Sequence, residues 1–257
     1  MNRKDLRLEI RDDIAIVRLS RPAKRNALND ELILAVRDLF DNLPDTVRAA
    51  VLDGEGDHFC AGLDLSELKE RNAGQGMHHS RMWHAALEQV QYGPVPVIAA
   101  LHGAVVGGGL ELASACHIRV ADETAFYALP EGSRGIFVGG GGAVRIPRLI
   151  GVARMADMML TGRVYNAQEG ERIGFAQYLV PAGTASEKAL ELARRVAQNA
   201  PLTNYALMHA LPRIAEQPAD QGFLTEALMA AIAQSDPEAK IRVRAFLDGK
   251  AAKVKRG

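Results

Sequence analysis

The sequence has few cysteines and no long apolar run, and both shortages exclude whole classes of protein. Two cysteines in 257 residues, Cys60 and Cys116, are too few for a disulfide scaffold or a cysteine-rich metal site. Proline, histidine, glycine and glutamate interrupt the longest apolar stretch, and the charged N-terminus lacks the apolar core of a signal peptide. We therefore expect no membrane span, no metal site and a reducing compartment such as the bacterial cytoplasm.

The sequence also lacks net charge, because 31 lysines and arginines balance 31 aspartates and glutamates. The composition therefore gives no reason to propose nucleic acid as the main partner. The chain contains no nucleotide P-loop, no dinucleotide fingerprint after a strand, no nucleophile-elbow serine motif and no zinc-protease helix motif. What remains is a chain that is 48% hydrophobic and long enough for one large domain, alone or with an appendage.

Two glycine clusters are the most informative feature that is present, and each lies between a predicted strand and a predicted helix. The apolar run 94–103 is short and bounded by proline and glycine, which is typical of a buried strand. Gly107 to Gly109 follow it and precede a helix predicted over 110–116. A strand pair predicted over 117–129 leads to the second cluster, Gly139 to Gly142, and to a further helix.

A carboxylate accompanies each glycine corner. Glu111 lies in the first turn of its predicted helix, and Glu131 follows the strand pair. The N–H groups at a helix start can hold a phosphate or a developing oxyanion, so corners that face each other would bring two acids to one binding site. The alternative for each piece is simpler: a tight turn for the glycines and a solvated partner of the helix dipole for the glutamate.

The rest of the chain predicts a mixed α/β body followed by a helical end. Alternating apolar residues around Asp12 and Asp13 predict a hairpin, and Asn29 is expected to cap a helix that starts after it. His78, His79 and His84 are predicted on a polar helix face within 66–93, and His102 and His117 as hydrogen-bonded structural residues. We divide the chain into a core over 1–190 and a helical region over 191–257, with helices at 186–199, 202–217, 223–235 and 237–250.

Five segments, in this order, resemble the enoyl-CoA hydratase/isomerase (crotonase) superfamily. The resemblance spans nearly the whole chain and implies an α/β fold: a crotonase-like spiral of repeated ββα units with a C-terminal helical trimerisation region. It also implies a homotrimer or hexamer. The segments are RPAKRNAL (21–28), HFCAGLDL (58–65), HGAVVGGGLELASAC (102–116), AFYALPEGSRGI (125–136) and LTGRVYNAQEGERIGFAQYLVP (160–181).

The resemblance implies a role for each matching residue. The backbone N–H groups of Ala61 and Gly108 match the oxyanion hole of the family. Glu111 and Glu131 match the two catalytic glutamates of its hydratases, of which the first activates water and the second protonates the α-carbon. Coenzyme A is then part of the substrate, an acyl-CoA thioester, and no separate cofactor is implied. The positions that match CoA contacts are Lys24, Arg25, Ala27, Cys60, Ala61, Leu63 and Gly107.

Three positions depart from the family pattern. His117 replaces a usual aspartate, Val138 replaces a common proline, and Arg134 stands where an apolar residue is common. A cation at position 134 suggests a polar or carboxylated acyl group, and the alternative is an arginine that faces solvent or a second subunit.

We predict a hydro-lyase that adds water to a trans-2-enoyl-CoA and gives a 3-hydroxyacyl-CoA. The alternatives within the family are a Δ3,Δ2-enoyl-CoA isomerase and another CoA-thioester lyase or hydrolase. From a different class, a non-catalytic relative that binds CoA or RNA also has to be weighed. The neutral charge and the presence of both glutamates argue against it.

Overall fold

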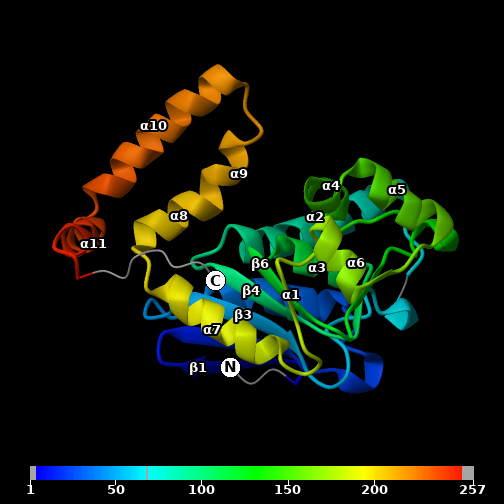
Figure 1. Ribbon diagram of the computed structural model, residues 1–257. Helices are drawn as coiled ribbons and strands as arrows, with labels where there is room; N and C mark the ends of the chain where they lie inside the picture. The colour runs from blue at the N-terminus through cyan, green and yellow to red at the C-terminus, as the bar shows by residue number, and fades with distance from the viewer. Residues whose placement is uncertain (1–3, 68, 251–257) are drawn as a thin grey trace. The chain divides into compact units, whose positions relative to one another are not determined.

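The computed structural model describes residues 4–67 and 69–250, and the chain divides into two compact units (Figure 1). The units are Met1–Arg195 and Val196–Gly257. The first mixes strands and helices, and the second is helical throughout its described part. The division predicted from the sequence, after residue 190, lies five residues before this boundary.

A six-stranded sheet with the order β1-β2-β3-β4-β6-β9 forms the centre of the first unit. β1 and β2 are an antiparallel hairpin that turns at Asp12, as predicted, and the other neighbouring strands are parallel. β3 and β4 are buried along their whole length, as expected for parallel strands covered on both faces. The strands are Leu6–Arg11, Ile14–Leu19, Ala49–Gly54, Val97–Leu101, Ile118–Asp122 and Tyr178–Val180, in the order given.

A second, three-stranded sheet contains β5 (Ala104–Val106), which leads into the first glycine cluster, and β7 (Phe126–Ala128), which precedes the second. It pairs β5 in parallel with β7, and β7 antiparallel with β8 (Tyr165–Asn166). The segment 58–65 pairs with other parts of the chain through two single bridges, in which Cys60 pairs with Val105 and Leu63 pairs with Leu28. These bridges bring loops that are distant in sequence to the start of the helix that follows β5.

Six α-helices and most of a seventh belong to the described part of the first unit. The first begins where predicted, because Asn29 accepts a hydrogen bond from the Leu32 N–H group. The seventh is tied to β3 by a 2.8 Å hydrogen bond from the Ser186 hydroxyl to Asp53. The helices, α1 to α7, are Asp30–Asp41, Ala73–Gln91, Gly108–Ala115, Gly142–Ile150, Val152–Thr161, Ala167–Ile173 and Ala185–Ala197.

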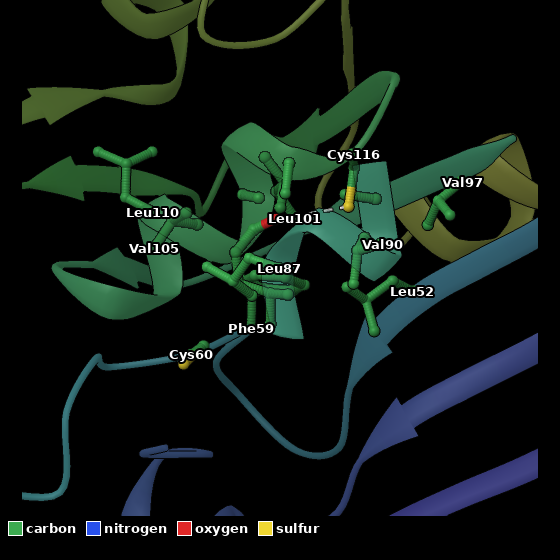
Figure 2. Close-up of a cluster of buried hydrophobic side chains, with 14 of the residues drawn as sticks. Leu52, Phe59, Cys60, Leu87, Val90, Val97, Leu101, Val105, Leu110 and Cys116 are labelled. Atoms are coloured by element: carbon green, nitrogen blue, oxygen red, sulfur yellow. Dashed lines mark hydrogen bonds between the residues drawn. The ribbon is translucent and has the colours of Figure 1, made fainter. Parts of the chain in front are cut away.

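The apolar core fixes two of these helices against the sheet (Figure 2). Leu87 and Val90 of α2, Leu110 of α3, Leu52 of β3 and Leu101 of β4 are all at most 1% exposed. Fully burying one such side chain contributes roughly 1.5–3 kcal/mol. Packing of this density holds α2 and the start of α3 in a defined position, and both carry residues of the site described below.

The second unit contains α8 (Pro201–His209), α9 (Leu211–Ile214), α10 (Ala219–Ser235) and α11 (Pro237–Leu247). The single helix predicted over 202–217 is wrong, since the chain divides there into α8 and α9. Pro212 lies in the first turn of α9, and it cannot donate the N–H bond that a continuous helix needs. In the part of the chain that the structure describes, no helix is both long and apolar enough to cross a bilayer.

Candidate active site

The two glycine corners face one cavity of about 380 Å³ in the first unit. The start of α3 contributes Gly108 and Glu111, and the loop after β7 contributes Glu131. The cavity thus brings together the two carboxyl groups that the sequence singles out, together with a helix N-terminus. The other lining residues are Leu63, Arg71, Gly76, His79, Ser80, Trp83, Ile136, Phe137, Val138, Gly139 and Gly140.

Glu111 is held by the second glycine cluster. Its side chain is 4% exposed, and its Oε1 atom accepts hydrogen bonds from the N–H groups of Gly140 and Gly142, both at 2.8 Å. Burial raises the pKa of Glu111 to about 7, although these two N–H groups favour the ionised form and oppose the shift. The carboxyl group therefore titrates close to neutral pH, where it can accept a proton.

Glu131 lies opposite, and one of its oxygens is unsatisfied. The side chain is 8% exposed, and Oε2 is buried without a hydrogen-bond partner among the described residues. Burial raises the pKa of this carboxyl group as well. Gly107 has a positive φ of 52°, which favours glycine, and a Cβ atom there would lie 2.7 Å from Glu131 Oε1. An unsatisfied buried carboxyl oxygen is costly, and a bound substrate or water can supply its partner.

The structure corrects the predicted pair of oxyanion donors. The Ala61 N–H group donates to the carbonyl oxygen of Arg25 at 2.9 Å, so it is not available to a ligand. The Leu63 N–H group has no acceptor among the described residues, because the bridge to Leu28 uses the neighbouring groups, Gly62 O and Asp64 N, at 2.7 Å each.

Gly108 provides the second N–H group at this point. It is the first residue of α3, and its N–H group has no acceptor in the described part of the chain. A Cβ atom on Gly108 would lie 3.6 Å from the backbone nitrogen of Leu63, so the two N–H groups are close neighbours. Leu63 and Gly108, rather than Ala61 and Gly108, therefore offer two free donors beside the glutamates.

The predicted CoA-contacting loop, 21–28, is joined to the segment after Leu63 by ion pairs. Lys24 Nζ lies 2.7 Å from Asp64 Oδ2 and 3.0 Å from the Ser66 hydroxyl, and Arg21 lies 2.9 Å from the same Asp64 oxygen. The hydrogen bond from Lys24 and the others from Ser66 and Arg21 hold the pKa of Asp64 well below its usual range. Arg25 is exposed, with a left-handed backbone at φ 50°. The carbonyl group of Ala27 accepts a 2.6 Å hydrogen bond from Arg21.

Two further predicted CoA contacts have backbone N–H groups that are already hydrogen-bonded. Cys60 donates its N–H group to Ala104 O and accepts from Val106 N, at 2.9 and 3.0 Å, and its thiol donates to Asn26 O. Burial raises the pKa of this thiol to about 12, so it stays protonated. Gly107 donates to Ala128 O and accepts from Glu111 N. These N–H groups shape the corner and are not available to a ligand.

One wall of the cavity is absent from the sequence predictions. Gly76, His79, Ser80 and Trp83 of α2 all line it, and their spacing of i, i+3, i+4 and i+7 marks one helix face. The sequence predicts only that His79 lies on a polar helix face, and it does not predict that this face lines the cavity, where His79 Nε2 lies 2.6 Å from Asp30 Oδ1. The i, i+3, i+4, i+7 spacing is the sequence signal that these residues share one helix face.

The three departures from the family pattern have different positions. His117 accepts the Val97 N–H group at 2.9 Å and contacts Gln91 O at 2.9 Å, so it is a hydrogen-bonded structural residue, as predicted. Val138 is 8% exposed and lines the cavity. Arg134 is exposed and is not among the lining residues.

The fold and the site define a class of enzyme: a spiral of ββα units in which two free N–H groups lie beside two buried carboxyl groups, suited to a thioester that gains charge. The described residues contain no cluster of three or more side chains able to hold a metal ion. The family model for enoyl-CoA hydratase/isomerase matches residues 9–255. The chain therefore belongs to the enoyl-CoA hydratase/isomerase family and is an enzyme that acts on CoA thioesters.

Individual relatives agree with this assignment. The chain is 32% identical to an enoyl-CoA hydratase of Mycobacterium tuberculosis over 253 residues, which cover 96% of this chain and 95% of the relative. It is 32% identical to the 2,3-dehydroadipyl-CoA hydratase of Escherichia coli over 238 residues, covering 91% and 92%. A crystal structure from Rhodopseudomonas palustris, provisionally named an enoyl-CoA hydratase, is 63% identical, covers 97% of each chain and superimposes with a TM-score of 0.93.

Proposed function

We propose that this enzyme is an enoyl-CoA hydratase, which adds water across the 2,3 double bond of a trans-2-enoyl-CoA. The observation that carries the proposal is the pair of buried carboxyl groups, Glu111 and Glu131, each with a raised pKa, at one cavity. Hydration requires a base for the incoming water and an acid for the α-carbon, and two such groups can share these tasks near neutral pH. The hydratase names of the two curated relatives support the same choice.

In this proposal the thioester oxygen accepts hydrogen bonds from the N–H groups of Leu63 and Gly108. These donors stabilise the negative charge that develops as the thioester becomes an enolate. Ionised Glu111 removes a proton from water, whose oxygen forms the new bond to the β-carbon. Protonated Glu131 gives its proton to the α-carbon, so that the elements of water are added. A proton passed from Glu111 to Glu131 through solvent restores both groups.

The CoA part of the substrate would contact the loop 21–28. Lys24 and Arg25 offer positive charge to the phosphates, although Lys24 already pairs with Asp64 at 2.7 Å. Such contacts act equally on the bound substrate and the transition state. Neutralising both cations should therefore raise KM and leave kcat nearly unchanged.

A Δ3,Δ2-enoyl-CoA isomerase is the second candidate, and one observation favours it. Moving a double bond needs the same oxyanion donors and a single carboxyl group as proton carrier, and the unsatisfied Oε2 of Glu131 could act in this way alone. The raised pKa of Glu111 would then have no chemical role. We favour hydration because it uses both groups.

Oligomerisation into a homotrimer or hexamer is part of the proposal. The number of subunits comes from the resemblance to the family, and the apolar surface of the second unit supports association. α10 has large apolar side chains around most of its circumference, and Gly222 is its one buried residue. Exposed apolar area of this extent marks an interaction surface. A cytoplasmic location remains a prediction from the sequence.

The proposed reaction is tested by offering two substrates to the purified enzyme. Crotonyl-CoA should lose its conjugated absorbance as it becomes 3-hydroxybutyryl-CoA, and 3-hexenoyl-CoA should be converted slowly or not at all. Rapid formation of 2-hexenoyl-CoA without hydration of crotonyl-CoA would favour the isomerase.

A further inference from the structure

Arg71 is a cation in the wall of the active-site cavity with most of its hydrogen-bonding capacity unused. Its side chain is 22% exposed, and it lines the same cavity as Glu111 and Glu131. Among the described residues, its guanidinium group makes one polar contact, 3.5 Å to Asp30 Oδ2. A guanidinium group carries five N–H donors, so several donors remain for a ligand.

Asp30 does not neutralise this wall by itself, because it is shared. His79 Nε2 lies 2.6 Å from Asp30 Oδ1, and the Trp83 indole N–H group donates to the same oxygen at 3.1 Å. Partial burial opposes ionisation, but the hydrogen bonds from Trp83 and His79 lower the pKa of Asp30. The ionised carboxylate of Asp30 thus makes its two shorter contacts with His79 and Trp83. Its contact with Arg71 is the longest of the three.

The remaining surface of the cavity is mainly apolar. Leu63, Ile136, Phe137 and Val138 contribute carbon surface, and the Ser80 hydroxyl already donates to Gly139 O at 2.6 Å. An acyl chain that is apolar to its end would pack against these residues and leave the guanidinium group without solvent, which is costly. An acyl chain that ends in an anion would pack its carbon atoms against the apolar residues and pair its charged end with the guanidinium group.

We propose that the acyl group of the substrate ends in a carboxylate that binds Arg71. A planar guanidinium group matches a carboxylate with two parallel N–H···O bonds, and such charge-assisted pairs are stronger than neutral hydrogen bonds. The reaction rests on the proposed hydratase function, whereas the binding contact does not. Arg71 also borders a smaller pocket of about 230 Å³ beside Lys69 and Asp64, so the phosphates of CoA are the competing ligand to be separated by the test.

The test compares trans-2-hexenoyl-CoA with the analogue in which a carboxylate replaces the terminal methyl group. The native enzyme should have the higher kcat/KM on the carboxylate-ended chain. Arg71→Met should lower that kcat/KM by about 10–100-fold and raise the kcat/KM for the methyl-ended chain, because no guanidinium group is then buried against that chain. Arg71→Lys should restore part of the preference for the carboxylate-ended chain. Arg37→Met is the matched control, since Arg37 lies on α1, is 41% exposed and pairs with Asp38 outside the cavity.

Calorimetry with the two saturated acyl-CoAs and with free CoA makes the inference independent of turnover. Selective loss of affinity for the carboxylate-ended chain in Arg71→Met supports it. Equal loss for all three ligands assigns Arg71 to the CoA phosphates and overturns it, as does equal affinity of the native enzyme for both chains. If the carboxylate preference holds but neither enoyl-CoA is hydrated, the hydratase proposal fails and the binding inference stands.

Discussion

The carboxyl group of Glu111 and the N–H group of Gly142 are joined by a 2.8 Å hydrogen bond in the interior of the enzyme. Gly142 begins α4, so this bond places the proposed base at the N-terminus of a second helix. Two N–H groups are too few to offset burial, because the pKa of Glu111 is still raised to about 7. The balance leaves a carboxyl group that both accepts and releases protons near neutral pH.

This raised pKa predicts that the enzyme loses stability as pH rises. The usual pKa of 4.5 applies in the unfolded chain and about 7 in the folded one, so the folded state binds the proton more tightly. The contribution is complete below about pH 4.5 and disappears as pH rises through 7, a change of roughly 3 kcal/mol. Glu111→Gln keeps an oxygen that can accept from both N–H groups but does not titrate, so its stability should lack this pH-dependent contribution. Urea unfolding at pH 5 and pH 8 measures the difference, and an equal pH effect in both proteins would refute the assignment.

Neighbouring glycines at the start of α3 should respond differently to the same substitution. In Gly108→Ala the new methyl group would lie 3.3 Å from Trp83 Cζ3 and 3.6 Å from Leu63 N, where it blocks the proposed thioester oxygen. We expect a folded enzyme with kcat reduced about 100-fold or more. In Gly109→Ala the methyl group would meet Cys60 Cβ at 2.7 Å and overlap its carbonyl oxygen.

Gly109→Ala should therefore lose about 3 kcal/mol or more of unfolding free energy, as overpacking against a backbone does. Thermal melts and initial rates, measured on both variants, test the predicted loss of stability in Gly109→Ala and the predicted loss of kcat in Gly108→Ala. Full activity in a well-folded Gly108→Ala protein would remove Leu63 and Gly108 from the mechanism.

Arg145 is expected to position Glu111 through the backbone of Gly140. The buried guanidinium group donates to Gly140 O at 2.9 Å and to Gln91 Oε1 at 2.7 Å, while the N–H group of Gly140 faces Glu111. Its charge also favours the ionised carboxylate. In Arg145→Met the pKa of Glu111 should rise further, so kcat should fall several-fold at pH 7 and less at pH 9.

The pH profile of kcat is the measurement for Arg145, because a purely structural role would lower kcat equally at every pH. Arg145→Lys should restore part of the profile. Arg148→Met, an exposed position on the same helix, should leave it unchanged.

The second unit should mediate assembly. Phe223 and Leu228 of α10 are 70% and 57% exposed, and Phe246 of α11 is 61% exposed. We expect sedimentation at micromolar concentration to give a trimer or hexamer. Phe223→Glu combined with Leu228→Glu should shift it toward monomer, and Glu226→Gln on the same helix should not. A native protein that sediments only as a monomer would contradict this prediction.

Local signals predicted the parts of the site that depend on local chemistry. The Asn29 cap, the Asp12 turn and the glycine corners each follow from residues a few positions apart. The choice of Leu63 over Ala61 depends on which N–H group the Leu28 bridge leaves free, and that pairing joins loops about 35 positions apart. Pro212 is the local signal for the break before α9, because proline favours the first turn of a helix over its interior.

Arg71 and His79 show a second limit on what the sequence can predict about the site. Their role depends on Asp30, at the start of α1, reaching α2 and the loop before it. Charge and helical spacing suggest a polar face, but they do not show that the face lines a cavity. That information lies in the packing of α1 and α2 against the sheet.

The proposed reaction makes a specific demand on Glu111 and Glu131. Each of the variants Glu111→Gln and Glu131→Gln should reduce kcat by about 10²–10⁴-fold, as loss of a general acid or base does. Crotonyl-CoA binding should persist in both. The double variant should be little worse than either single one, because the two residues act as a unit.

Transfer of ¹⁸O from labelled water to crotonyl-CoA tests the hydratase proposal most directly. The native enzyme should give 3-hydroxybutyryl-CoA that carries the label, detected by mass spectrometry, and both glutamine variants should lose this product in proportion to kcat. An unlabelled product pool, together with fast conversion of a 3-enoyl-CoA to the 2-enoyl isomer, would contradict hydration and identify an isomerase.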